Sequence, residues 1–239
     1  MGVFITSWSV ALCYWLNQGF EPNMLLLALA TMGYYSLDHW LDLKAITGKG
    51  LERFRLANGL LLITATLFAL ILAASSGFVA TVLSFTERFW LSGLVGAIYF
   101  LLRWVKSPLK VLLKPLLIAL AAGAAIAKPA LGLDWLQAAL VCFCNVLVFA
   151  YLERNKDLEL GNPNLFNIGF EKRWLAGFIV LAILLGIASD VLLEHRHGYG
   201  LTLYAFLSLM ILVSEQKLKE STYRWWLDAC LPLAFLPIG

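Results

Sequence analysis

Nine long apolar segments, separated by short polar connections, constrain this chain more than any other feature. Of the 239 residues, 61% are hydrophobic and 14% are charged, whereas a soluble domain is about 45–50% apolar and roughly 25% charged. A membrane-spanning helix needs about 20 mostly apolar residues. The segments are 3–20, 23–40, 58–83, 89–104, 111–131, 135–152, 174–193, 198–213 and 225–238. We therefore predict an all-α polytopic membrane bundle of about nine transmembrane helices, and we exclude a soluble globule, a disordered chain and a disulfide-stapled secreted module.

The third segment is the only ambiguous one. Ser75-Ser76-Gly77 either bends it or ends it early, but the eight residues 78–85 are too few to span alone, so the expected number stays at nine. Short connections leave little room for a separate soluble domain, and we expect a single domain over 1–239. The four cysteines lie inside apolar segments, where we interpret them as small buried hydrophobic residues.

Basic residues are divided unequally between the two sides of the predicted bundle. All but three of the 18 Lys and Arg residues follow an even-numbered segment, and the exceptions are Arg88, Lys128 and Arg196. The positive-inside rule places the basic side in the cytoplasm. We therefore predict an integral, multi-pass protein with a cytoplasmic N-terminus and a C-terminus on the opposite side, in the inner or plasma membrane if the source is bacterial.

Two acidic pairs close even-numbered segments on the predicted cytoplasmic side. Asp38 and Asp42 end the second segment, and Glu153 and Asp157 follow the sixth. A spacing of four places both members of a pair on one helix face, about 6 Å apart along the axis. Like charges repel at this distance unless a cation lies between them. Carboxylates suit Mg²⁺ held together with substrate phosphates, so the four acids are candidate metal and catalytic residues. The alternative is that each pair only marks a helix end.

Cationic side chains on the same side are candidates for binding diphosphate oxygens. The pairs recur 115 residues apart, which favours a weak four-helix pseudo-repeat over about 1–105 and 106–220. The cationic candidates are Lys44, Lys49, Arg53, Arg103, Lys106, Lys172 and Arg173.

Three spaced motifs resemble those of the UbiA superfamily of intramembrane prenyltransferases, and each falls at the helix end where that family has it. Tyr34 stands where the family has Asn, Glu153 where it has Asp, and Phe149 where it has Tyr, so the chain resembles a divergent member. The motifs are Tyr34-x-x-x-Asp38-x-x-x-Asp42, Tyr99-x-x-x-Arg103 and Phe149-x-x-x-Glu153-x-x-x-Asp157-x-x-x-Gly161.

The resemblance implies a UbiA-like bundle around a central cavity and Mg²⁺-dependent transfer of an isoprenyl group from a polyprenyl diphosphate to an aromatic or lipid acceptor. It implies Mg²⁺ on the four acids and a substrate pocket at Tyr34, Tyr99, Asn145 and Phe149. The partners are then an isoprenyl diphosphate, a small or lipidic acceptor and membrane lipids, and we expect no nucleic acid. The alternatives are an intramembrane terpene cyclase and a non-catalytic prenyl-lipid-binding subunit.

Further polar residues leave two interpretations open. Asn145 either makes an interhelical hydrogen bond or, with Thr31, Tyr34 and Tyr35, orients the acceptor. The connections 43–57 and 158–173 are either lids over the site or plain turns. Arg224 and Asp228 are four apart in the last segment and are expected to pair with each other.

Overall fold

The structure is a computed structural model. It describes residues 2–18, 23–43, 49–75, 77–102, 109–127, 133–159, 164–193, 198–214 and 220–235. Over these residues the chain is helical and contains no strand. Within them, three helical stretches are long and apolar enough to cross a membrane: Val82–Leu102, Asp134–Leu152 and Lys172–Val191. The all-α membrane character is therefore supported, and the number nine and the central cavity stay predictions.

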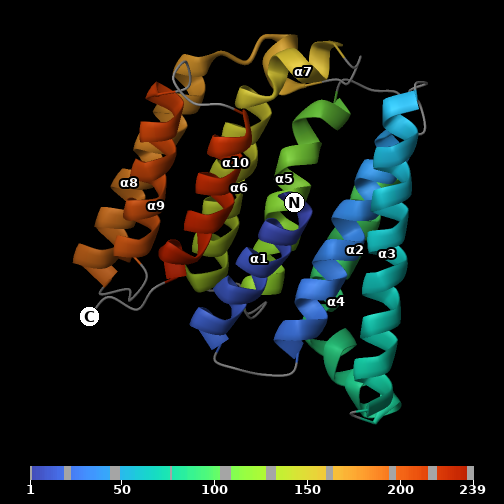
Figure 1. Ribbon diagram of the computed structural model, residues 1–239. Coiled ribbons are helices and arrows are strands. Elements are labelled where there is room, and N and C mark those ends of the chain that lie inside the picture. Colours follow the sequence, from blue (N-terminus) through green and yellow to red (C-terminus); the bar gives the residue numbers. More distant parts are fainter. Residues whose placement is uncertain are drawn as a thin grey trace.

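Apart from α3 and α4, the helices follow the predicted apolar segments closely, and the ninth segment is divided into an α-helix and a 3-10 turn. A short helix, α7, and a 3-10 turn, η1, lie between α6 and α8 (Figure 1). The elements are α1 Gly2–Gln18, α2 Asn23–Leu43, α3 Lys49–Ser75, α4 Phe78–Leu102, α5 Leu109–Ile126, α6 Leu133–Leu152, α7 Arg154–Glu159, η1 Leu165–Ile168, α8 Lys172–Leu193, α9 Gly198–Val213, α10 Glu220–Cys230 and η3 Leu231–Phe235.

The long helices run side by side and alternate in direction (Figure 1). The closest neighbours are consecutive helices: α2 packs on α3, α4 on α5, α5 on α6, and α8 on α9. α1 connects the N-terminal helices to the C-terminal segment, because it contacts α2 and α5 and also α10 and η3. The C-terminal ends of α2, α4, α6 and α9 all lie at the end of the bundle drawn uppermost in Figure 1.

Burial separates an inner helix from outer ones. In the apolar stretch of α6, 56% of residues are buried, against 17% in α4 and 22% in α8. Aliphatic side chains on α3 and α8, such as Ile63 and Leu184, are more than half exposed. Contiguous apolar surface of this extent is typical of proteins that face lipid. α6 is therefore central, and α3, α4 and α8 present the apolar exterior.

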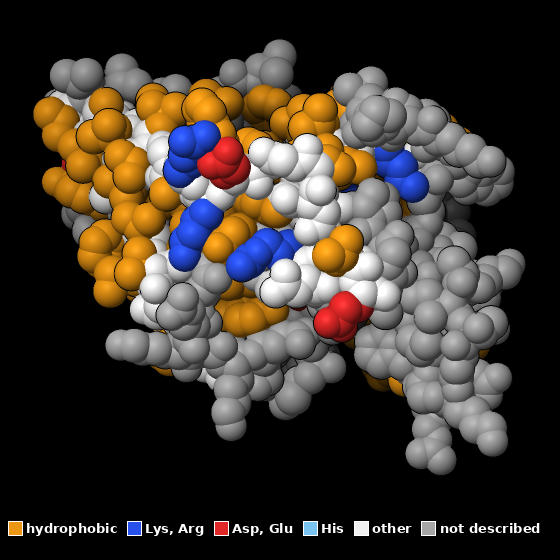
Figure 2. All heavy atoms as spheres, turned by 90° about the horizontal axis from the view of Figure 1, so that it is seen from above, with side chains coloured by type: hydrophobic (Ala, Val, Ile, Leu, Met, Phe, Trp, Pro, Cys, Tyr) orange, Lys and Arg blue, Asp and Glu red, His pale blue; other side chains and the backbone are white. Residues whose placement is uncertain are grey.

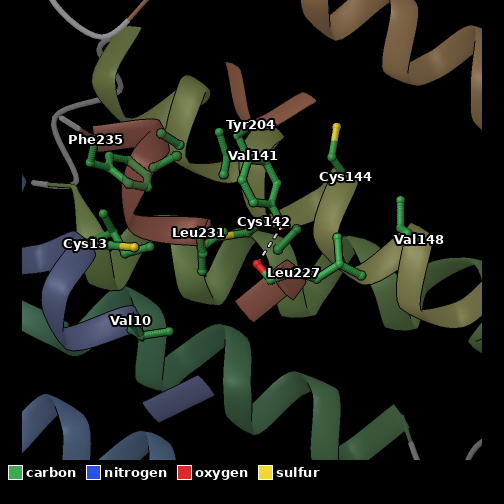
Figure 3. Close-up of a cluster of buried hydrophobic side chains, with 14 of the residues drawn as sticks. Val10, Cys13, Val141, Cys142, Cys144, Val148, Tyr204, Leu227, Leu231 and Phe235 are labelled. Carbon is green, nitrogen blue, oxygen red and sulfur yellow. Dashed lines mark hydrogen bonds between the residues drawn. The ribbon is translucent and has the colours of Figure 1, made fainter. Parts of the chain in front are cut away.

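The core forms where α6 meets α1, α9 and the C-terminal segment. Figure 3 shows Cys13 of α1, Cys142 and Cys144 of α6, Tyr204 of α9 and Leu231 of η3 within one cluster of buried side chains. All three of these cysteines are buried, and all four cysteines of the chain are free thiols. Their prediction as small buried hydrophobic residues is thus confirmed for these three, and Cys230 is only partly buried.

Small residues bring α5 and α6 into close contact. A Cβ added at Gly123 would lie 2.8 Å from the Cα of Ala139, closer than real Cβ contacts allow. Gly123 is therefore the residue that lets the two backbones approach. Gly93 on α4 has nothing within 4 Å of the same added atom, so it faces open space.

Of the two alternatives for the third segment, the early end at Ser75-Ser76-Gly77 is confirmed, and the boundary predicted at residues 84–88 is wrong. The predicted segments 58–83 and 89–104 place residues 84–88 between helices, whereas α3 ends at Ser75 and α4 begins at Phe78. Gly77 has a φ of 83°, a left-handed conformation that ends a helix. Thr86, Glu87 and Arg88 lie inside α4 because a polar triplet of this kind does not break backbone hydrogen bonding.

Arg88 is consequently a helix residue and not a loop residue. Its guanidinium carbon lies 5.2 Å from the centre of the Tyr14 ring on α1. This cation–π contact gives the charge a partner within the apolar layer. The long side chain also spans the distance between α4 and α1.

The last predicted segment, 225–238, is a short helix followed by a 3-10 turn. α10 has 11 residues, which is about 17 Å of helix, roughly half of a bilayer core. It is followed by η3, which contains Pro232 and contacts α1 and α9. Residues 236–238 lie outside the described part.

We predict that Gly123→Ala lowers the thermal unfolding temperature of the protein in detergent, because the new methyl group forces α5 and α6 apart at a cost of about 1–3 kcal/mol. Gly93→Ala is the matched control, in which the same change meets empty space and raises helix propensity. Equal melting temperatures for the two variants would contradict the assigned close contact.

Candidate functional site

Two of the three sequence motifs meet in space. Tyr99 of α4 is 5% exposed, and its hydroxyl donates to Oδ1 of Asp38 on α2 at 2.7 Å. Asp38 is four residues from Tyr34 along α2, so the two residues share one face of the helix. The contact joins the first acidic pair to the Tyr99-x-x-x-Arg103 motif, 61 residues away along the chain.

An aromatic cluster adjoins this hydrogen bond. The Tyr34 ring lies 5.7 Å from Tyr99, 5.0 Å from Phe100 and 6.0 Å from Tyr35, measured between ring centres. A Cβ added at Gly96 would touch the Tyr34 ring at 3.4 Å, so the small residue gives that ring its place. The cluster forms an electron-rich wall beside Asp38, and such a wall favours cations.

The ammonium group of Lys114, which the sequence did not single out, lies over the ring of Tyr99 in the Tyr99-x-x-x-Arg103 motif. Nζ of Lys114 on α5 is 5.8 Å from the centre of the Tyr99 ring. In the sequence, Lys114 was only one of several basic residues after the fourth segment. Its position is set by the packing of α5 on α4, which no local pattern indicates.

The second acidic pair lies where α6 passes into α7. The backbone N–H of Glu153 donates to the backbone carbonyl of Phe149 at 2.9 Å. The backbone N–H of Asp157 donates to the backbone carbonyl of Glu153, also at 2.9 Å. Hydrogen bonds between residues four apart therefore continue through the junction. Glu153 and Asp157 are separated by one helical turn, as the spacing predicts, and both side chains are partly exposed.

Asn164 connects Asp157 to the segment that follows α7. Its amide nitrogen donates to Oδ2 of Asp157 at 2.5 Å and to the carbonyl of Ala150 at 2.8 Å. Its amide oxygen accepts from the backbone of Phe166 and so begins η1. One buried amide thus holds α6, α7 and η1 together.

Segment 164–170 is a docked turn rather than a plain loop. Gly169, with a φ of 109°, ends η1. The Phe166 ring packs edge-on against Tyr151 of α6 at 5.0 Å. Arg154 and Lys172 lie over the same Tyr151 ring, at 3.9 and 5.4 Å from its centre. Of the predicted diphosphate-binding cations, Lys172 and Arg173 have described side chains: both are exposed, and Arg173 pairs with Glu171 at 2.6 Å.

Two predicted pocket residues face α10. The amide nitrogen of Asn145 donates to Oδ1 of Asp228 at 3.3 Å, which confirms the interhelical hydrogen bond that was one of its two interpretations. The Phe149 ring contacts Tyr223 at 6.3 Å. Both residues therefore line the contact between α6 and α10.

Asp228 has two partners that the sequence did not predict. Its carboxylate accepts from the side-chain amide of Asn145 on α6 and, at 2.5 Å, from the hydroxyl of Thr6 on α1. The side chain of Arg224 lies outside the described part, so the pairing of Arg224 with Asp228 stays a prediction.

Several predicted residues cannot be placed at side-chain level. The backbone of Asp42, Lys49 and Arg53 lies in α2 and α3, but their side chains lie outside the described part. Lys44, Arg103 and Lys106 lie outside the described residues altogether.

Charged side chains gather at one end of the bundle. Figure 2 views that end and shows Lys, Arg, Asp and Glu side chains among polar atoms, with hydrophobic side chains around them. An open apolar hollow is lined by Leu112 of α5, by Leu165 and Ile168 of η1, by Gly169 and Phe170 after it, and by Trp174 of α8. None of the predicted site residues lines this hollow.

The carboxylates of the candidate site do not form one metal cluster, but they supply oxygens of the kind that Mg²⁺ binds. Within the described part, no three His, Cys, Asp or Glu side chains gather as metal ligands, so Asp38, Glu153 and Asp157 do not share one ion among themselves. Mg²⁺ is held by one or two carboxylates plus waters and phosphates, so a triple cluster is not required. Tyr99 donates to Oδ1 of Asp38 and Asn164 donates to Oδ2 of Asp157, and both carboxylates supply hard oxygen atoms of the kind that Mg²⁺ binds.

Comparison of the chain with models of protein families, with curated proteins and with solved structures found no match.

We predict that Asn164→Ala increases amide hydrogen exchange in residues 164–170, because it removes the cap of η1 and the link to Asp157. The expected loss of local stability is about 1–2 kcal/mol. Asn167→Ala is the matched control, since the side-chain amide of Asn167 makes one exposed hydrogen bond, to the backbone carbonyl of Arg154. Equal exchange in the two variants would show that Asn164 does not hold the segment.

Proposed function

We propose that this chain is a membrane prenyltransferase that resembles the UbiA superfamily and moves an isoprenyl group from a polyprenyl diphosphate to an aromatic or lipid acceptor. The observation that carries the proposal is the hydrogen bond from Tyr99 to Asp38. The two residues belong to motifs that were recognised separately in the sequence. Their contact supports the interpretation of those motifs as parts of one site.

The position of the two acidic pairs also supports the proposal. Asp38 lies near the C-terminal end of α2 and Glu153 directly after α6, and both of these ends lie at the same end of the bundle (Figure 1). The two pairs, Asp38 with Asp42 and Glu153 with Asp157, would each hold Mg²⁺ together with phosphate oxygens, and the bound metal would neutralise charge on a departing diphosphate. Tyr99 keeps one oxygen of Asp38 in place, and Lys172 lies among the cations at that end of the bundle.

The apolar surroundings suit the donor. A prenyl tail is aliphatic, and an allylic cation survives only where water is excluded. The rings of Tyr34, Tyr99 and Phe100 lie next to Asp38 and present faces that stabilise positive charge. The aromatic wall therefore suits the carbon end of the donor, and Asp38 its phosphate end.

A terpene cyclase is the second candidate, and Tyr34 favours it. Its ring lies among Tyr35, Tyr99 and Phe100 and occupies space beside Asp38. A smaller pocket favours quenching of the cation within its own chain. Analysis of products formed with and without added acceptor distinguishes the two reactions.

We predict that Asp38→Asn lowers turnover of a radiolabelled prenyl diphosphate in membranes by about 10²-fold or more, since it removes charge that the departing diphosphate needs. Tyr99→Phe has a smaller effect of the same sign, because the ring remains and only the hydrogen bond is lost. Removal of Mg²⁺ with EDTA abolishes turnover in the unchanged protein.

Asp134→Asn is the control for these variants. Asp134 is an exposed carboxylate in the first turn of α6, at the opposite end of that helix from Glu153. Its loss leaves turnover unchanged. Normal turnover in Asp38→Asn, with all variants folded, would remove the proposed role of the first acidic pair.

The proposed orientation places the acidic pairs on the cytoplasmic side. We predict that a cysteine introduced at Glu159 reacts with a membrane-impermeant maleimide only from the cytoplasmic side, whereas one at Asp134 reacts only from the other side. Both positions are exposed, and they flank the apolar stretch of α6. Labelling of both from the same side would contradict the proposed crossing of α6.

A further inference from the structure

A carboxylate outside all three motifs lies inside the bundle. Asp228 of α10 is 5% exposed and accepts hydrogen bonds from Thr6 of α1 at 2.5 Å and from Asn145 of α6 at 3.3 Å. Three helices that are distant in sequence therefore place polar groups at one point. Carboxylates inside apolar segments are costly and are functional candidates by default.

The orientation of the Asn145 amide follows from chemistry. Only its nitrogen can donate to the Asp228 carboxylate, so its oxygen must point elsewhere. That oxygen is buried, and within the described residues it has no hydrogen-bond partner. Asn145 itself is 7% exposed. A buried acceptor without a donor raises the free energy of the folded state, and a ligand hydroxyl would satisfy it.

Aromatic residues connect this point to the first acidic pair. The hydroxyl of Tyr35 on α2 lies within electrostatic range of both Asp38 and Asp228. The Tyr35 ring meets Tyr34 edge-on at 6.0 Å. Tyr204 of α9 also lies within electrostatic range of Asp228. The wall beside Asp38 thus continues toward Asp228.

We propose that Asp228 and Asn145 form the binding site for the hydroxyl of a phenolic acceptor, and that Asp228 receives its proton. This inference rests on the proposed function. The phenol O–H donates to the free amide oxygen of Asn145 or to Asp228, and its ring lies against Tyr35. A flat aromatic ring suits this wall, and a hydroxyl suits the unsatisfied acceptor.

The proposed step balances. The bond from the prenyl carbon to the diphosphate oxygen breaks, and diphosphate keeps the electron pair. A ring carbon ortho or para to the hydroxyl forms the new carbon–carbon bond, and the O–H proton passes to Asp228. The resulting dienone regains its aromaticity when the ring proton moves to the oxygen. One proton is released overall, through Asp228.

The test measures binding to the full chain in lipid nanodiscs by thermal unfolding. The acceptor probes are 1-naphthol and its methyl ether, 1-methoxynaphthalene, and the donor probe is Mg²⁺ with farnesyl thiodiphosphate. We expect the unchanged protein to bind naphthol at least about tenfold more tightly than the ether, because the ether offers no donor to a buried acceptor. Asp228→Asn and Asn145→Ala lose this preference and keep the response to the donor.

Ser208→Ala is the matched control. Ser208 is also fully buried, but its hydroxyl donates to the carbonyl of Tyr204 in its own helix. It keeps both responses. Should Asp228→Asn fail to fold, Asn145→Ala decides, since it removes the unsatisfied oxygen and leaves the carboxylate. With a turnover assay, Asp228→Asn lowers transfer to the phenol by about 10²-fold and leaves donor binding intact.

The outcomes separate this inference from the proposed function. Stabilisation by the donor probe, with equal or no response to naphthol and its ether, overturns the inference alone. A naphthol preference that persists in both Asp228→Asn and Asn145→Ala also overturns it. The absence of any response to the donor probe overturns the proposed function instead.

Discussion

The lack of water in a bilayer core is the constraint on which this structure depends, because every backbone polar group must then be paired within the chain. Helices meet that demand locally, and the described residues form nothing else. Hydroxyl side chains follow the same rule: those of Thr31 and Thr64 donate hydrogen bonds to backbone carbonyls one turn earlier in their own helices. Charged groups cannot be satisfied in this way and need partners on other helices, so they mark the places where tertiary structure is decided.

The sequence predicted the helices well because their apolar pattern is long and repeated. It also marked Gly77, whose left-handed backbone ends α3, as one of two alternatives for that segment. It failed at Arg88, a charged residue that lies within α4 and contacts the Tyr14 ring of α1. Spacing also carried part of the candidate site, since backbone hydrogen bonds keep Glu153 and Asp157 one turn apart.

Partners that lie far apart in sequence were beyond prediction. Nothing in the pattern around Asn164 indicates that its amide holds Asp157 and the carbonyl of Ala150 together, because turn residues are usually interpreted locally. The same holds for Asp228, whose partners on α1 and α6 depend on how the C-terminal segment returns to the core. The hydrogen bond from Tyr99 to Asp38 joins residues of two separate motifs. The motifs singled out both residues, but nothing in their spacing along the chain predicts the contact.

The partly buried Asp38 and the buried Asp228 have different partners, and the difference bears on their chemistry. Asp38 accepts from the phenol of Tyr99, which α4 holds in place. Asp228 accepts from the side-chain amide of Asn145, whose own oxygen is buried and has no hydrogen-bond partner within the described residues. Tyr35 lies within electrostatic range of both. A positive charge that forms near this tyrosine is attracted from two sides, in an apolar interior where such attraction is strong. On the proposed function, both carboxylates stabilise a cation formed during the reaction, whereas in the resting protein the hydrogen bonds from Tyr99, Thr6 and Asn145 satisfy them.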